Sequence, residues 1–157
     1  MKPKADIVAA VNAAQLEVVR ALLREYQATL PAKCRFDDAE WQYLPGPYAP
    51  PRGTFLLATV AGAPAGCVGL RPFPSPGACE MKRLYVMPQL RGSGLGRELV
   101  MAAVLRAREL GYSRMRLDTI PGSMTAAVEL YRQFGFVVLN PAEPGVTSGL
   151  LYMELSL

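Results

Sequence analysis

Apolar residues recur at intervals of three and four positions in three segments of the chain, the spacing that gathers them on one face of a helix. The first stripe follows Asn12 and Gln15, which resemble a capping box. Proline or glycine stands directly after each segment, as is typical where a helix ends. The pattern predicts long helices over residues 16–30, 95–110 and 124–134, and a short one over 37–43.

Short apolar segments bounded by glycine and proline lie between these helices and are typical of strands. Two of them flank Ala61-Gly-Ala-Pro64 and predict a hairpin, whereas 44–53 holds four prolines and two glycines and is expected to be a loop. The predicted strands are 7–11, 54–60, 65–70, 79–86, 115–120, 136–139 and 150–157. This order indicates an α/β (α+β) fold, in which helices pack on the faces of a mixed, mostly antiparallel sheet.

The segment Arg91-Gly-Ser-Gly-Leu-Gly-Arg97 stands between a predicted strand and a predicted helix. A strand, a glycine-rich turn and a helix start together present several backbone N–H groups at the positive end of a helix dipole. Glycine allows the backbone to approach an anion closely or to take a positive φ. The two arginines at the ends of the segment add positive charge. We therefore predict a pyrophosphate site here.

The same glycines leave three alternatives open. A P-loop needs Gly-Lys-Ser or Gly-Lys-Thr where this chain has Gly96-Arg-Glu98, which places no hydroxyl for magnesium. A Rossmann site has its glycines after the first strand of a βαβ unit, but these lie mid-chain and the nearby acid is Asp118, at a strand end. The third alternative is a turn that merely starts a helix.

Composition favours one compact domain over 1–157, since the chain has 157 residues of which 51% are hydrophobic. It contains no run of 18 apolar residues and no leader-like start, so we expect neither a membrane span nor a membrane partner. Cys34, Cys67 and Cys79 form no CxxC pair, and we expect reduced, mostly buried thiols in a cytoplasmic protein.

The chain has no histidine. Serine and cysteine triads that need histidine and the common zinc sites are therefore excluded, no metal is expected, and a general base must be a carboxylate, tyrosine, lysine or water. The net charge of +4 is spread without a long basic run, so we do not expect nucleic-acid binding.

Four motifs together resemble the GNAT superfamily of N-acetyltransferases. They are Glu80-Met-Lys-Arg-Leu-Tyr-Val86, Arg91-Gly-Ser-Gly-Leu-Gly96, Ala127-Val-Glu-Leu-Tyr131 and Gly135-Phe136. The resemblance covers nearly the whole chain in element order, and the Leu44-Pro-Gly, Tyr48–Gly53 and Leu70-Arg-Pro72 stretches resemble a subgroup of small bacterial members. It implies a single GNAT domain with about six or seven strands, about four helices and splayed central strands that form a cleft for acetyl-CoA.

The resemblance also assigns roles to individual residues. The amides of the glycine loop would bind the CoA pyrophosphate with help from Arg97, and the end of the preceding strand would pair with the pantetheine arm. In the family a bulge splays that strand from its neighbour. The residues expected to contact acetyl-CoA are Leu84, Tyr85, Val86, Arg91, Gly92, Ser93, Gly94, Leu95, Gly96 and Arg97.

Tyr131 matches the tyrosine that the family places near the thioester sulfur, and Glu80 is our candidate base. Glu80 shares strand parity with Lys82, Leu84 and Val86, so these side chains face one way unless a bulge intervenes. The alternatives are a core tyrosine at 131 and a surface carboxylate at 80. Many members carry an asparagine near position 124 where this chain has Met124, which puts any contact of that asparagine in doubt.

We therefore expect an enzyme that moves an acetyl group from acetyl-CoA to the primary amine of a small-molecule or amino-acid-like acceptor, by direct attack in a ternary complex. The loop 41–52 is expected over the acceptor. Asp37, Asp38 and Glu40 would attract an amine, and Arg52 and Arg71 a carboxylate, unless they are solvated surface charges. Protein or peptide acetylation, a non-catalytic acyl-CoA-binding module and a nucleotide-phosphate binder remain alternatives. Dimers are common in the family, although no feature of this sequence indicates one.

Overall fold

The computed structural model describes residues 4–32, 35–119, 125–140 and 150–157. Within these ranges, seven strands form one sheet in the order β1-β2-β3-β4-β5-β7-β6. Every neighbouring pair is antiparallel except β4 and β5, which are parallel. The strands are β1 (Ala5–Ala9), β2 (Thr54–Val60), β3 (Ala63–Pro72), β4 (Ala78–Val86), β5 (Arg114–Thr119), β6 (Val137–Val138) and β7 (Leu151–Ser156).

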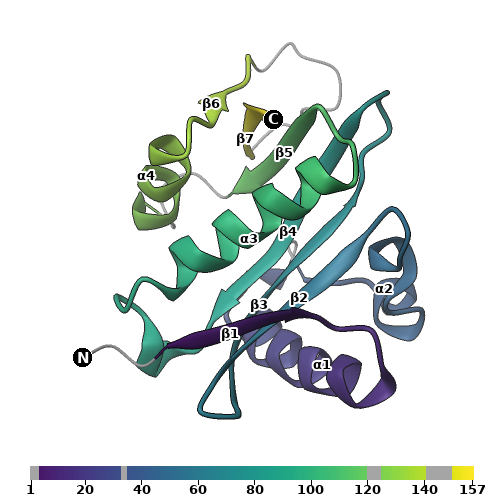
Figure 1. Cartoon of the computed structure of the whole chain (residues 1–157), viewed down its shortest axis with the longest axis vertical. Helices are drawn as coiled ribbons and strands as arrows, with labels where there is room; N and C mark the ends of the chain where they lie inside the picture. The colour runs from purple at the N-terminus through teal and green to yellow at the C-terminus, as the bar shows by residue number, and fades with distance from the viewer. Residues whose placement is uncertain (1–3, 33–34, 120–124, 141–149) are drawn as a thin grey trace.

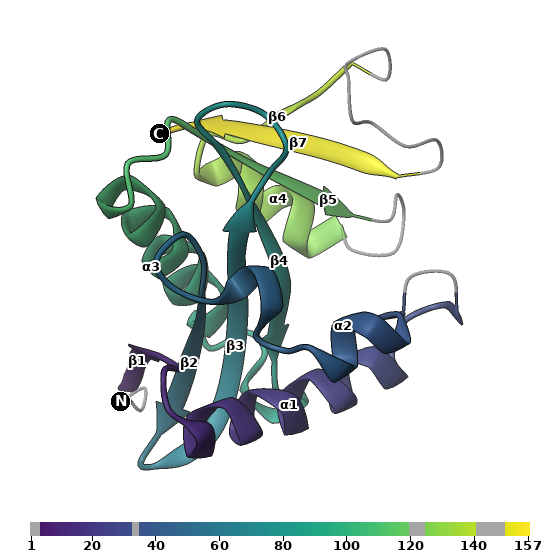
Figure 2. The ribbon, with the colours of Figure 1, turned by 90° about the vertical axis from the view of Figure 1, so that its right-hand side faces the viewer.

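Helices cover both faces of the sheet (Figure 1). The long helix α3 and the shorter α4 lie on one face, and α1 and α2 lie on the other (Figure 2). The α-helices of the described residues are α1 (Ala13–Ala28), α2 (Asp38–Gln42), α3 (Leu95–Glu109) and α4 (Thr125–Gln133), with single 3₁₀ turns η2 (Gly46–Tyr48) and η3 (Pro88–Leu90). None of the described helices is long and apolar enough to cross a membrane.

The two faces bury separate hydrophobic clusters. The α3 face includes Met81, Leu99 and Tyr131, and the α1 face includes Leu23 and Tyr85. Alternate residues of a strand point to opposite faces, so each central strand contributes to both clusters. This two-sided core buries β3 and β4 at the centre of the sheet.

Local sequence signals explain several boundaries. Asn12 caps α1 by accepting a hydrogen bond from the Gln15 backbone N–H at 2.8 Å, and the Gln15 side chain accepts one from the Asn12 N–H at 3.2 Å. The predicted capping box is therefore present. The predicted hairpin joins β2 to β3 through Ala61 and Gly62, whose φ angles are 50° and 81°. Two positive φ angles are typical of a two-residue hairpin turn.

The predicted mixed, mostly antiparallel sheet with helices on its faces is confirmed. The first strand lies two residues earlier than predicted, because the chain turns into the α1 cap at the exposed Val11. Within the predicted loop 44–53, the chain makes the 3₁₀ turn η2. Cys34 and the Ser123-Met124 pair lie outside the described residues. Cys67 and Cys79 are buried as expected, and burial raises the pKa of each thiol to about 12.

Gly69 of β3 allows two aromatic rings to pack directly against the strand. The rings of Tyr48 and Phe55 stack with their centroids 4.4 Å apart. A Cβ at position 69 would lie 2.7 Å from Tyr48 Cε1 and 2.9 Å from Phe55 Cε1, closer than carbon atoms normally pack. The glycine is therefore required by the close approach of these rings.

We predict that Gly69→Ala destabilises the protein by about 1–3 kcal/mol, since the added methyl overpacks this site. Gly96→Ala is the matched control: its Cβ would meet Leu130 Cδ2 at 3.8 Å and Val86 Cγ2 at 3.9 Å, which are ordinary contacts. Denaturant unfolding of both variants measures the difference. Equal stability of the two variants would contradict the prediction.

Candidate active site

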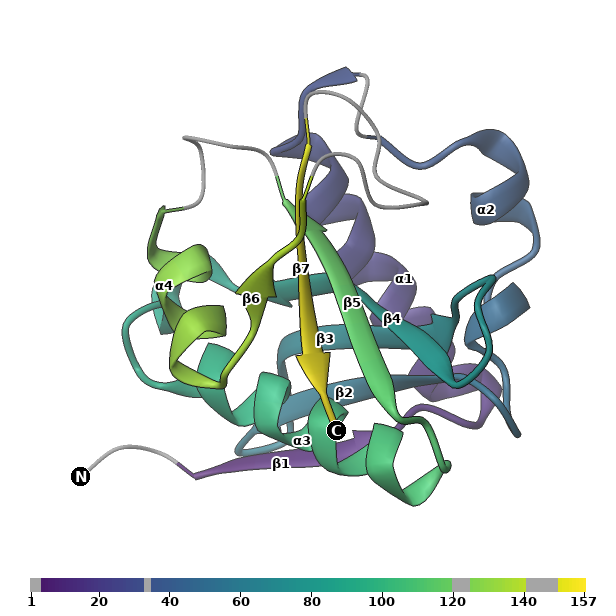
Figure 3. The same cartoon turned by 90° about the horizontal axis from the view of Figure 1, so that it is seen from above.

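The central strands β4 and β5 separate soon after they begin. They pair only through Ala78–Glu80 of β4 and Arg114–Arg116 of β5. Beyond these pairs the two strands diverge (Figure 2), while β5 stays paired with β7 along its whole length (Figure 3). Among the described residues, the edge of β4 from Met81 to Val86 therefore has no strand partner on its β5 side. Backbone N–H and C=O groups along this edge are available to an extended ligand.

A β-bulge interrupts β4 in the same stretch. Cys67 lies opposite Tyr85 and Gly69 opposite Lys82, so Arg83 and Leu84 share a single position in the register. Arg83 has a φ of 61°, the left-handed conformation that a residue other than glycine seldom adopts. Such a bulge adds one residue to one strand and reverses the facing of everything after it.

The predicted shared facing along β4 therefore ends at the bulge. Met81 before the bulge and Leu84 and Val86 after it all pack against the α3 cluster. Glu80 and Lys82 precede it and, by alternation with Met81, point to the α1 face. The glutamate thus faces away from the two residues expected to meet the pantetheine arm.

A cleft of about 870 Å³ occupies the gap between the diverging strands. Its volume falls within the usual range of small-molecule and cofactor sites. Leu84, Ala127 and Tyr131 belong to the α3 side, whereas Tyr26 and Tyr85 belong to the α1 side. Because its walls come from both faces, the cleft crosses the sheet. The remaining lining residues are Thr29, Leu30, Arg35, Asp37, Glu40, Arg71, Met81, Lys82, Arg83, Val86, Arg91, Leu117, Asp118, Thr119, Ala126 and Leu150.

The glycine loop leads from the cleft to the start of α3. Gly92 and Gly94 have φ angles of 79° and 93°, so glycine relieves strain at both positions. Gly94 is the N-cap of α3 and makes no side-chain capping bond, since it has no side chain to do so. No side chain of the N-cap residue therefore occupies the N–H groups in the first turn of α3. These groups lie at the positive end of the helix and can donate to an anion. The binding of a pyrophosphate at this loop remains a prediction.

The two arginines of this loop are placed differently. Arg91 lines the cleft, and its Nε donates to the Val86 carbonyl at 3.2 Å. Arg97 is exposed; it donates to the Gln133 side chain, and its guanidinium lies 5.4 Å from the ring centroid of Phe134. Arg97 therefore sits at the junction of α3 with α4.

Tyr131 is buried in the wall of the cleft, with 7% of its surface exposed. Burial raises the pKa of its phenol above the ordinary value, and the nearby Tyr26 and Asp118 raise the pKa further. The phenol therefore stays protonated at neutral pH, a state in which it can donate a hydrogen bond.

The two carboxylates near the strand gap have different surroundings. Glu80 is 6% exposed, its Oε1 lies 3.0 Å from Arg71 Nε and 2.9 Å from Arg71 Nη2, and it does not line the cleft. Asp118 does line the cleft, with Oδ1 3.7 Å from Lys82 Nζ. In the sequence, Asp118 stands out only as an acid at a strand end. The signal that would have singled it out is its place on the strand that diverges from β4.

A second ion pair ties α2 to the bulge. Arg83 donates to both carboxylate oxygens of Glu40, at 3.1 and 2.6 Å, and its guanidinium lies 3.7 Å from the ring centroid of Phe36. The Tyr48 hydroxyl donates to Glu40 at 3.4 Å. These contacts build the wall of the cleft on the α1 side.

The sequence predicts five charged residues near the acceptor, and the structure places three of them in the lining of the cleft. Asp37, Glu40 and Arg71 line the cleft, whereas Asp38 and Arg52 are exposed elsewhere.

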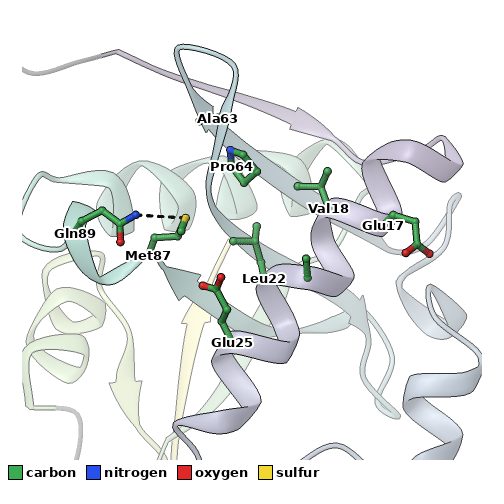
Figure 4. Close-up of a pocket in the computed structure, with 9 residues that line it drawn as sticks. Glu17, Val18, Leu22, Glu25, Ala63, Pro64, Met87 and Gln89 are labelled. Atoms are coloured by element: carbon green, nitrogen blue, oxygen red, sulfur yellow. Dashed lines mark hydrogen bonds between the residues drawn. The ribbon is translucent and has the colours of Figure 1, made fainter.

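A smaller cavity of about 480 Å³ lies between α1, the β2–β3 hairpin and η3. Figure 4 shows Val18, Leu22 and Met87 around it, with the carboxylates of Glu17 and Glu25 nearby. Its lining is mostly apolar and does not include Tyr131, Asp118 or the glycine loop. It therefore lacks Tyr131 and Asp118, which line the larger cleft; of the glycine loop, Arg91 lines that cleft and residues 92–97 do not.

Known proteins resemble this chain along most of its length. The model of the acetyltransferase (GNAT) family matches residues 16–136. An uncharacterized N-acetyltransferase of Schizosaccharomyces pombe is 38% identical over 162 residues, covering 100% of this chain and 98% of the relative.

Solved structures share the fold. A GNAT-family acetyltransferase from Staphylococcus aureus has a TM-score of 0.79 at 17% identity, covering 98% of this chain and 99% of that one. A Bacillus subtilis acetyltransferase in complex with CoA has a TM-score of 0.71 at 21% identity, covering 98% and 99% of the two chains.

We predict that Tyr131 does not ionise in the ordinary tyrosine range while the protein is folded, because burial raises its pKa. In a spectrophotometric titration, folded Tyr131→Phe should lose no amplitude near pH ~10 relative to wild type. In concentrated guanidinium chloride the variant should lose one of the seven phenol signals. Loss of amplitude near pH ~10 in the folded variant would contradict the prediction.

Proposed function

Because this chain belongs to the GNAT family and is an acetyl-CoA-dependent N-acetyltransferase, we propose that its cleft holds acetyl-CoA and a primary amine together and that the amine attacks the thioester directly. The observation that carries this proposal is the path of the cleft. It joins the residues beside the glycine loop on one face of the sheet to a charged wall on the other. The two substrates thus approach the strand gap from opposite faces.

The donor half of the cleft suits CoA. The N–H groups of residues 92–96 lie at the start of α3, where a pyrophosphate gains from the helix dipole. The unpaired edge of β4 at Leu84–Val86 offers backbone groups to the pantetheine amides, in the manner of an added strand. The Bacillus subtilis acetyltransferase, which has the same fold, forms a complex with CoA, and this supports CoA as the donor here.

The reaction needs proton transfers at two atoms. An alkyl ammonium group, with a pKa of about 8–10.4, must lose a proton before its nitrogen can attack the carbonyl carbon. Negative charge then develops on the carbonyl oxygen, where a backbone N–H of Leu84–Val86 stabilises it. When the C–S bond breaks, the thiolate of CoA takes up the second proton that the attacking nitrogen loses and becomes a thiol. Tyr131 remains a neutral donor and hydrogen-bonds the departing sulfur.

The acceptor half favours a small molecule with a primary amine over a protein tail. Its wall is fixed by the Glu40–Arg83 pair, the stacked Phe36 and the Tyr48 hydroxyl. A wall held by several contacts is preformed and limits the size of the acceptor.

Thiol release from acetyl-CoA with a broad panel of amines tests the proposed function. We expect turnover with small primary amines or amino acids and N-acetyl products in equal amount to the thiol. Saturable acetyl-CoA binding without thiol release would instead indicate a non-catalytic module. Turnover confined to peptides or proteins would indicate a protein N-acetyltransferase.

We predict that Tyr131→Phe lowers kcat by at least about tenfold, because the departing sulfur loses its hydrogen-bond donor. The Kd for acetyl-CoA, measured by calorimetry, should change little. Tyr112→Phe is the matched control, since its hydroxyl donates to the Arg52 carbonyl at 2.6 Å outside the cleft. Unchanged turnover in Tyr131→Phe would remove Tyr131 from this role.

A further inference from the structure

One ion pair spans the gap where the central strands diverge. Lys82 of β4 and Asp118 of β5 face each other there, with Nζ and Oδ1 3.7 Å apart. Their side chains are 16% and 22% exposed, and both line the cleft. By alternation with Met81 and Leu117, which belong to the α3 cluster, both side chains point to the α1 face. The pair thus lies on the acceptor side of the point where the two halves of the cleft meet.

This pair is looser than the other two pairs of the site. Arg83 and Glu40 approach to 2.6 Å, and Arg71 and Glu80 to 2.9 Å. A separation of 3.7 Å is too long for a direct hydrogen bond. An ammonium has three donors and a carboxylate about four acceptor sites, so both groups retain capacity for a ligand.

Tyr131 and Arg116 are the other groups to consider near Asp118. Tyr131 lies close enough to feel its charge and presents a neutral phenol. Arg116, two residues earlier on the same side of β5, donates to Glu154 at 2.8 Å. Lys82 is therefore the cation that faces Asp118 from the neighbouring strand.

The charges around the acceptor favour a ligand that carries both signs. Among the described residues of the acceptor half, Arg83 is bound by Glu40, and Arg71 is bound by Glu80 just outside the lining. The other charged residues of this half are the cations Arg35 and Lys82 and the carboxylates Asp37 and Asp118. A polyamine would meet these cations as well as the carboxylates, which disfavours it. A head group that carries both signs finds a partner for each.

We propose that the Lys82–Asp118 pair receives the head group of a free α-amino acid. This inference rests on the proposed function and names its acceptor. The α-carboxylate binds Lys82 Nζ, and the α-ammonium binds Asp118. Asp118 takes one proton from the ammonium, and the freed nitrogen attacks the thioester carbon. As the C–S bond breaks, the nitrogen loses a second proton and the departing thiolate gains it, which gives the N-acetyl amino acid, CoA thiol and protonated Asp118.

This assignment moves the proton acceptor from Glu80 to Asp118. Glu80 is bound by Arg71 and lies outside the cleft lining, whereas Asp118 lines the cleft and lies close to Tyr131. A general base must lie within reach of the proton that it removes. Among these two carboxylates, Asp118 meets that condition.

The first experiment compares each free amino acid with its amide and with the amine formed by its decarboxylation. The best amino acid should exceed both analogues in kcat/KM by at least about tenfold, because a charged partner is lost in each. Measurements at several pH values allow for the lower amine pKa of the amide. Equal or better turnover of the amides, amines, polyamines or peptides would overturn the inference and leave acetyl transfer intact.

The second experiment uses variants of the pair. Lys82→Met should lower kcat/KM for the amino acid by about tenfold or more and leave the decarboxylated amine nearly unaffected. Asp118→Asn should lower turnover of both by about 100-fold at neutral pH, and the loss should shrink as pH rises, because the amine then deprotonates in solution. Arg106→Met, which breaks a surface ion pair on α3, is the matched control.

Calorimetric acetyl-CoA binding and circular dichroism establish that each variant is folded. Equal losses for amino acid and amine in Lys82→Met would overturn the role of Lys82. A pH-independent loss in Asp118→Asn, or a pH-dependent loss in Glu80→Gln in its place, would overturn the role of Asp118. Acetyl-CoA binding without thiol release from any amine in the wild type would instead contradict the proposed function itself.

Discussion

The cleft exists because the ladder between β4 and β5 is short. β4 and β5 share three residue pairs and then separate, although each keeps its other neighbour, β3 or β7. A strand edge inside a protein must satisfy its N–H and C=O groups with another partner. The gap leaves the edge of β4 without a strand partner among the described residues, and an extended ligand such as the proposed pantetheine arm would complete the sheet there.

The bulge at Arg83 and Leu84 determines which side chains border that gap. It adds one residue to β4, so that Leu84 and Val86 join the α3 face while Lys82 remains on the α1 face. Its left-handed residue carries a conformational cost of about 1 kcal/mol or more. Two contacts of Arg83, the bidentate bond to Glu40 and the stacking over Phe36, offset that cost. The same contacts fix α2 against the cleft.

Most of the fold could be predicted from the sequence because its signals are local. The capping box at Asn12, the hairpin at Ala61 and Gly62 and the glycine-rich turn before α3 each depend on a few neighbouring residues. The bulge has no such signal, because arginine is an ordinary strand residue and its left-handed conformation depends on Glu40, 43 positions away in the sequence.

The site could be predicted only in part for the same reason. Strand parity predicts that Glu80 faces the same way as Leu84 and Val86, which the bulge prevents, and it gives no indication of the partner, Arg71, which comes from a different strand. Asp118 gains its place from the divergence of β5, which no short motif indicates. Tyr131 does line the cleft, because its position on α4 follows from a helical stripe that the sequence does show. Its chemical role remains a prediction.

Because the cleft passes through the sheet, its two halves draw on different parts of the chain. The donor half uses the end of β4 and α4, beside the glycine loop. In the acceptor half, Tyr26 of α1 and Glu40 of α2 form an outer wall, and Lys82 and Asp118 of the central strands lie at the inner end. On the proposed assignment, the side chain of an acceptor and its reacting head group therefore meet different elements, so that substitutions in α1 or α2 would change side-chain selectivity while the reacting groups stay in place.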